Sequence, residues 1–302
     1  MRPAQEFAHC LAEQVTMPEV YRGFRRLIAA PDSKINDYVD VINSDPALAT
    51  RFIRIANNSF FGYPRKVNDI EQAISLIGVM QVHDVLISSL AMRAFAGIPK
   101  DIVNLAAFWE NSVYCGIVAR IIAKKCTLPA SQRFFALGLF HDIGHIVMYA
   151  KRPELAQEAL KYSLQQGESL FRAERKILGF DYGQLGCELM RLWHLPENFQ
   201  EITQYHFEPE KAQQYPLETA IVHLAYSITQ VENGHSDPRE HPTLLVSPLA
   251  WKLTKLKEND IKPISAEAQE YVQEVLAALW PFVEPLYKKD FAKQGRLNCE
   301  DF

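Results

Sequence analysis

The chain has 302 residues, of which 48% are hydrophobic and 23% charged, as is usual for a globular protein with one large or two modest domains. A formal net charge of −4 gives no electrostatic reason to expect binding to nucleic acid or to an anionic membrane. No apolar run is long enough to span a bilayer, and the N-terminal region contains no secretory signal. We therefore expect a cytoplasmic protein whose five scattered cysteines are reduced thiols.

The stretch DPALATRFIRIANNSFFG, residues 45–62, has the period of an amphipathic helix, with apolar side chains recurring at every third or fourth position. Ser44 or Asp45 can cap its first turn, and Pro46 suits a position where a missing N–H costs nothing. Gly62 marks the end of the pattern. The stretch predicts one helix followed by a turn.

Residues 68–97 predict two further helices, the first capped by Asp69 and ended by Gly78. Two short helices around a glycine can form a DNA-binding helix-turn-helix. The second helix, however, has no arginine before Arg93 to contact phosphate or guanine. A packed helical hairpin is therefore favoured.

The rest of the chain also has helical period. From about Phe108 to residue 230, apolar residues recur at helical spacing, and the breaks between them are short and contain proline. A polar stretch at 232–242 is the clearest change of composition, and a C-terminal helix is expected over residues 265–287. No alternating run is long enough to indicate a sheet. The sequence predicts an all-α fold.

The segment FHDIGH, residues 140–145, carries the strongest chemical signal. His141 and Asp142 are adjacent, so imidazole and carboxylate can both reach one divalent ion. His145 follows one helical turn later, at a spacing that lets two imidazoles meet one ion. Asn111 shares a helix face with Cys115 and is expected to point into the same core. On spacing alone, a hydrogen-bonded polar cluster is favoured over a metal pocket, because a His-Asp doublet is a weak motif.

Six segments match one family pattern in order: TMPEVYRGFRRLI, INSDPALATRFIRIANNSFFG, DIEQAISLIGVMQV, FWENSVYCGIVAR, ALGLFHDIGHIVM and GFDYGQLGCELMRLWHLPENFQEITQYHFEP. Together they resemble the HDOD family of bacterial signalling domains, which is related to the HD-type metal phosphohydrolases. The resemblance implies an HD-like helical core packed against an N-terminal helical subdomain, and no catalytic activity is generally established for the family. We expect this domain at residues 16–230, divided near residue 100, with a C-terminal helical extension at 231–302.

The resemblance also indicates which ligands of a catalytic HD site are missing. Its His-Asp doublet falls on His141 and Asp142, but its early histidine falls on Asn111 and its late aspartate on Tyr226. A neutral amide and a protonated phenol are poor ligands for most divalent ions. His206 falls where related phosphodiesterases carry further metal-binding histidines. The pattern predicts a degenerate site without a bound metal; were a divalent metal present, its ligands would be His141, Asp142, His145 and His206.

Two hypotheses from different classes follow. The first is a non-catalytic signal-transduction module that binds protein partners and neither nucleic acid nor membrane. The alternative is a metal-dependent phosphohydrolase acting on a nucleotide or phosphodiester, supported by the intact doublet with His145 and His206. A cyclic-dinucleotide phosphodiesterase of the HD-GYP type is disfavoured, because His145 stands where that type has lysine and the segment EKAQQYP lacks its glycines.

Overall fold

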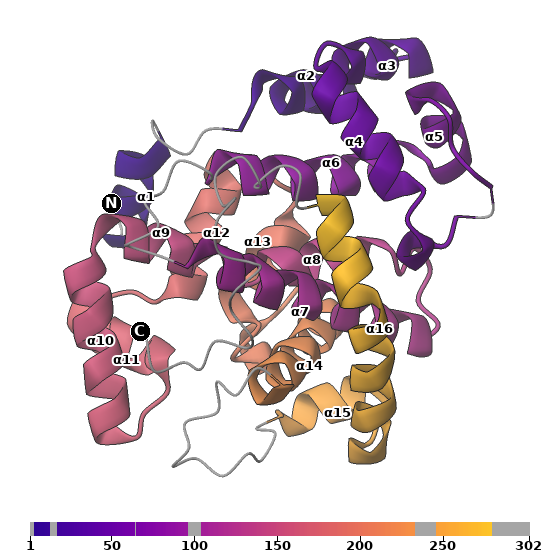
Figure 1. Ribbon diagram of the computed structural model, residues 1–302. Helices are drawn as coiled ribbons and strands as arrows, with labels where there is room; N and C mark the ends of the chain where they lie inside the picture. Colours follow the sequence, from indigo (N-terminus) through magenta and orange to yellow (C-terminus); the bar gives the residue numbers. More distant parts are fainter. Residues whose placement is uncertain (1–2, 13–16, 64, 96–103, 233–245, 280–302) are drawn as a thin grey trace, which may run out of the picture. The chain divides into compact units, whose positions relative to one another are not determined.

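A computed structural model describes residues 3–12, 17–63, 65–95, 104–232 and 246–279, and every regular element in these ranges is helical (Figure 1). The described residues fall into two compact units. The smaller unit contains residues 17–95 together with 270–279, and the larger contains the others. No helix in the described ranges is long and apolar enough to cross a membrane.

Side-chain caps begin α4 and α5 of the smaller unit, as the sequence predicts. Asp45, rather than Ser44, accepts a hydrogen bond from the Leu48 N–H at 3.0 Å, and Asp69 accepts one from Gln72 at 2.8 Å. Gly78 ends its helix with a φ of 84°. The elements of this unit are α2 (Glu19–Ala29), α3 (Ile35–Asn43), α4 (Pro46–Ala56), η1 (Ser59–Phe61), α5 (Ile70–Ile77), α6 (Val79–Ala94) and the end of α16 (Ile261–Leu279).

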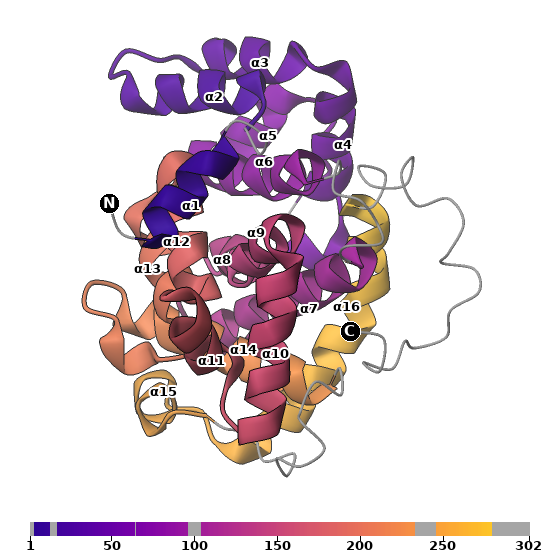
Figure 2. The ribbon, with the colours of Figure 1, turned by 90° about the vertical axis from the view of Figure 1, so that its left-hand side faces the viewer.

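The larger unit is built around α7, which is buried over most of its length and packs against α8 and α14. Helices α10 and α11 lie side by side as a hairpin (Figure 2). Its elements are α1 (Pro3–Ala12), α7 (Leu105–Lys125), α8 (Arg133–Phe140), α9 (Ile143–Lys151), α10 (Pro153–Gln166), α11 (Leu170–Leu178), α12 (Tyr182–Leu192), α13 (Glu197–Tyr205), η2 (Pro209–Lys211), α14 (Pro216–Glu232), α15 (Pro248–Thr254), η3 (Glu258–Asp260) and the start of α16.

The C-terminal helix begins earlier than the sequence predicts. α16 starts at Ile261 instead of residue 265, and the predicted part beyond residue 279 lies outside the described residues. Near its start, Ser265 lies 3.0 Å from the hydroxyl of Tyr114 and donates to Glu232 at 2.6 Å. Near its end, Glu274 accepts hydrogen bonds from the backbone and the hydroxyl of Ser59. Polar side chains therefore hold α16 in both of the units to which its residues belong.

A close backbone contact joins α9 to α12 in the larger unit. A Cβ atom at Gly144 would lie 1.9 Å from the carbonyl oxygen of Tyr182 and 2.9 Å from the nitrogen of Gly186. Only glycine leaves room for this approach. Gly144 belongs to the FHDIGH segment, so the contact fixes the position of Tyr182 relative to His141 and Asp142.

Replacing Gly144 with alanine should lower the free energy of unfolding by more than about 3 kcal/mol, because the added methyl group would overlap the backbone of Tyr182. Denaturant unfolding followed by circular dichroism measures the loss. Gly167→Ala is the control, because Gly167 has a φ of 64° and open space around its Cβ position. This substitution should lower the free energy of unfolding by only about 1–2 kcal/mol. Equal losses in the two variants would contradict the close contact.

Candidate functional site

The His-Asp doublet forms the turn between α8, which ends at Phe140, and α9, which begins at Ile143. His141 is buried, and its Nδ1 donates a hydrogen bond to the carbonyl of Gly138 at 2.7 Å. Because a carbonyl can only accept, the proton lies on Nδ1 and Nε2 carries the lone pair. Burial lowers the pKa of His141, which favours this neutral form.

His206, directly after α13, has the same arrangement. It is fully buried, and its Nδ1 donates to the carbonyl of Thr203 at 3.0 Å, so Nε2 again carries the lone pair. Burial, reinforced by the neighbouring His141, holds the pKa of His206 well below its usual value. The rings of His141 and His206 meet edge to face with centroids 5.0 Å apart.

These residues fit a divalent metal ion by type and by spacing. His141, Asp142 and His206 each offer one ligand atom, and the three atoms lie within 4.8 Å of one another. Both imidazoles are held by backbone carbonyls through their other nitrogen, as metal-binding histidines usually are. Asp142 keeps 21% of its side chain exposed, and its buried Oδ1 receives no aligned hydrogen bond. We call these three residues the HD triad.

His145 lies beside Asp142 and outside the HD triad. Its Nδ1 is 2.8 Å from Asp142 Oδ1, and its Nε2 is 3.3 Å from Oε1 of Glu174, which is buried on α11. Burial, the largest single effect, would lower the pKa of His145, but Asp142, Tyr149 and Glu174 together outweigh it and raise that pKa well above its usual value. Although burial also opposes the ionised carboxylate, His145 holds the pKa of Asp142 below its usual range. A protonated imidazole therefore lies between two carboxylates.

Tyr182, the first residue of α12, completes the other side of the site. Its hydroxyl lies 3.3 Å from His206 Nε2, a long hydrogen bond, and its ring stacks on His145 with centroids 3.7 Å apart. Burial and the neighbouring hydroxyl of Tyr226 on α14 raise the pKa of the Tyr182 hydroxyl well above its usual value. Burial raises the pKa of Tyr226 to about 12, so its hydroxyl is protonated at neutral pH. Neither tyrosine offers an anionic oxygen to a metal ion.

The structure brings most of the predicted site residues together. His141, Asp142 and His206 form the HD triad, with the ring of Tyr226 5.5 Å from that of His141 and 5.1 Å from that of His206. His145 pairs with two carboxylates instead of joining the triad. Asn111, expected to face the site from α7, is only half-buried.

Glu174 and Tyr182 are site residues that sequence reasoning missed. Glu174 lies in the charged run RAERK, which is typical of a solvated helix face, yet only 1% of its surface is exposed. Tyr182 lies in the segment GFDYG, directly after Asp181, which caps α12. Its proximity to a helix start was visible, but nothing in the local pattern linked it to His206, 24 residues later.

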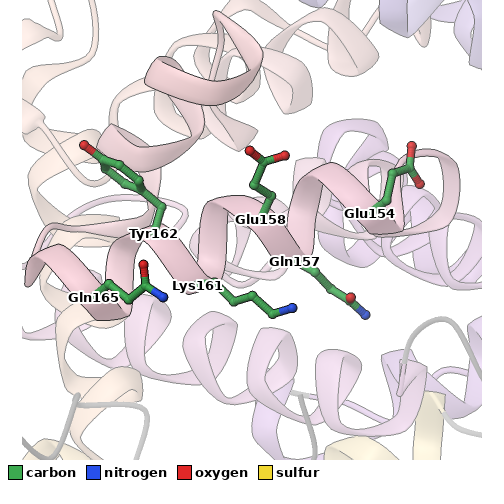
Figure 3. A pocket seen from close by; sticks show the side chains of 6 residues that line it. All are labelled: Glu154, Gln157, Glu158, Lys161, Tyr162 and Gln165. Atoms are coloured by element: carbon green, nitrogen blue, oxygen red, sulfur yellow. The ribbon is translucent and has the colours of Figure 1, made fainter.

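A groove of about 430 Å³ lies along α10, and Figure 3 shows its lining side chains in two rows on that helix. None of the lining residues belongs to the HD triad. The chemistry of the larger unit therefore centres on the buried side chains at the HD turn and not on this groove. The lining residues are Glu154, Gln157, Glu158, Lys161, Tyr162 and Gln165.

The fold and the His-Asp turn define an all-α protein of HD type. The model of the HDOD domain matches residues 15–209, about two thirds of the chain, so this chain belongs to the HDOD domain family. A solved HDOD domain protein of unknown function from Geobacter sulfurreducens is similar with a TM-score of 0.66 at 20% identity, over 94% of this chain and 98% of its own. The family and the all-α fold predicted from the sequence are confirmed.

Other similar proteins carry functional names. A Shewanella amazonensis protein provisionally named a phosphohydrolase has a TM-score of 0.67 at 20% identity, over 92% of this chain and 97% of its own. A Marinobacter aquaeolei protein provisionally named a signal transduction protein has a TM-score of 0.64 at 20% identity, over 89% of this chain and 60% of its own. An uncharacterized protein of Treponema pallidum (strain Nichols) is 23% identical over 76% of this chain, which spans 45% of that relative's length. The solved structures support the fold alone.

The charged pair between His145 and Asp142 should make stability depend on pH. His145→Gln should cost about 3–5 kcal/mol of unfolding free energy near pH 6, because the partly buried Asp142 and the buried Glu174 lose their cationic partner. Since the folded-state pKa of His145 is raised, its contribution is complete below about 6.5 and is lost as the pH rises through that raised value. Denaturant unfolding at several pH values measures the difference.

The matched control is His194→Asn, which changes an exposed histidine at a left-handed φ that asparagine tolerates. This variant should stay within about 0.5 kcal/mol of the unmodified protein at every pH. A cost for His145→Gln that is small, or that grows as the pH rises, would contradict the charged pair.

Proposed function

We propose that this chain is a non-catalytic regulatory module of bacterial signal transduction, in which the HD-type site is degenerate. One observation carries the proposal: the chain itself supplies the partners that a metal ion would otherwise provide. His145 balances the charge of Asp142, and the hydroxyl of Tyr182 faces the lone pair of His206. Tyr226, with a protonated hydroxyl, stands where the family resemblance expects a carboxylate ligand.

A signalling role agrees with what is known of the HDOD family and with the name of the Marinobacter aquaeolei protein. We propose that the module acts in the cytoplasm by binding a protein partner. The net charge of −4 supports a protein rather than a nucleic acid as that partner.

A second candidate function is a metal-dependent phosphohydrolase acting on a nucleotide or phosphodiester. The spacing of the HD triad favours it, as does the partial exposure of Asp142. His141, Asp142 and His206 would hold the ion, and a bound divalent ion would supply an activated water or polarise a phosphate oxygen. Tyr182 and Tyr226 would then lie beside the substrate as neutral hydrogen-bond donors, because burial raises the pKa of both hydroxyls.

Metal analysis of the purified full chain separates the two functions. The regulatory function predicts far less than one divalent ion per chain after purification without chelator, and no hydrolysis of bis(p-nitrophenyl) phosphate with added Mn²⁺. About one tightly bound ion per chain that is lost in His141→Ala, together with turnover, would replace the regulatory function with the phosphohydrolase.

A variant with restored ligands provides the positive control. Asn111→His with Tyr226→Asp returns an imidazole and a carboxylate to the two positions that the family resemblance identifies as missing. This double variant should bind Mn²⁺ at least about tenfold more tightly than the unmodified chain, because imidazole and carboxylate are far better ligands than amide and phenol. Isothermal titration calorimetry measures both affinities under the same conditions.

A further inference from the structure

We infer that Tyr182 is the residue that keeps divalent ions out of the HD triad, because its hydroxyl occupies the one nitrogen of His206 that could bind them. This inference rests on the proposed function, in which the triad is without a tightly held ion. It assigns a role to a side chain that lies outside the triad and is not one of its ligands.

The tautomer of His206 makes the two partners mutually exclusive. Nδ1 of His206 donates to the carbonyl of Thr203, so Nε2 has a single lone pair and no proton. That lone pair can accept the Tyr182 proton or bind a metal ion, but not both. The backbone carbonyl of His206 accepts a 2.7 Å hydrogen bond from His223 Nδ1, which holds the residue in this position.

Tyr182 is held in place by three contacts and cannot readily swing away. Its carbonyl lies against Gly144, and its N–H donates to Glu174 at 2.9 Å. Its ring stacks on His145 at 3.7 Å, and only 1% of its surface is exposed. Movement of Tyr182 would require the N-terminus of α12 to move as well.

The other two members of the triad are less obstructed. His141 Nε2 has no hydrogen-bond partner among the described residues. Oδ1 of Asp142 has a charge partner in His145 but no aligned hydrogen bond. Removing the hydroxyl of Tyr182 therefore frees the third ligand of a set whose other two members are already in place.

The test is a Co²⁺ titration of the full chain and of Tyr182→Phe, followed by the visible absorption of cobalt bound to nitrogen ligands. Tyr182→Phe should bind Co²⁺ at least about tenfold more tightly, since one competing hydrogen bond is removed. The gain should disappear in Tyr182→Phe/His206→Ala. Tyr149→Phe is the matched control, because Tyr149 stacks on His145 with ring centroids 5.5 Å apart but is not a partner of His206. The Tyr149→Phe variant should bind Co²⁺ with the same affinity as the unmodified chain.

Tyr226 needs a separate variant, because its hydroxyl could turn to His206 once that of Tyr182 is gone. Tyr182→Phe/Tyr226→Phe should bind Co²⁺ at least as tightly as Tyr182→Phe, and Tyr226→Phe alone should bind like the unmodified chain. Circular dichroism verifies folding of each variant. Should Tyr182→Phe not fold, Tyr182→Leu removes the same hydroxyl and tests the same point.

The outcomes distinguish the inference from the function on which it rests. Tight, stoichiometric binding by the unmodified chain would overturn the metal-free regulatory function and the role of Tyr182 together. Weak binding by the unmodified chain and by every Tyr182 variant would overturn the role of Tyr182 and leave the regulatory function standing. An equal gain in Tyr182→Phe and Tyr149→Phe would also overturn it, because loosened packing would then explain the binding.

Discussion

The backbone contact between Gly144 and Tyr182 is the constraint on which the site depends. It brings the start of α12 against α9, where any side chain at residue 144 would collide with a carbonyl oxygen. As a result the Tyr182 ring lies on His145 and its hydroxyl reaches His206. The glycine of the HDIG segment thus has a packing role beside the two residues that give the motif its chemistry.

Charge balance is the second feature that distinguishes this site from an open metal centre. Asp142 and Glu174 are carboxylates in a largely buried region, and ionised carboxylates there need a cation. In a metalloenzyme the ion provides it. Here His145 lies between the two groups, and its raised pKa keeps it protonated at neutral pH. The chain's own imidazolium therefore does part of what a metal ion would do.

Local patterns in the sequence account for much of the fold. Asp45 and Asp69 act as caps because a carboxylate before an apolar helical stripe can satisfy a free N–H whatever the tertiary structure. The same reasoning fails for the start of α16, because Asp260, directly before the helix, accepts a hydrogen bond from the Lys257 N–H of the preceding turn.

The site was predictable only where the residues are adjacent or belong to a family motif. His141, Asp142 and His206 were identified in this way, and the fold brings them together. Tyr182 joins the site through the packing of α12 on α9, which depends on a glycine contact between residues 38 positions apart. Glu174 reaches the site from α11, where it accepts a hydrogen bond from the Tyr182 N–H. No helical period or spacing rule carries that information, so side chains that resemble a solvated face and a helix start were assigned no chemistry.

The most direct test of the account is nitrogen-15 NMR of the histidine side chains in the full chain, with and without one equivalent of Zn²⁺. The account predicts that His141 and His206 are neutral with the proton on Nδ1, that His145 is doubly protonated at neutral pH, and that zinc leaves these signals unchanged. Zinc-induced shifts of the Nε2 signals of His141 and His206, with loss of a proton from His145, would contradict it.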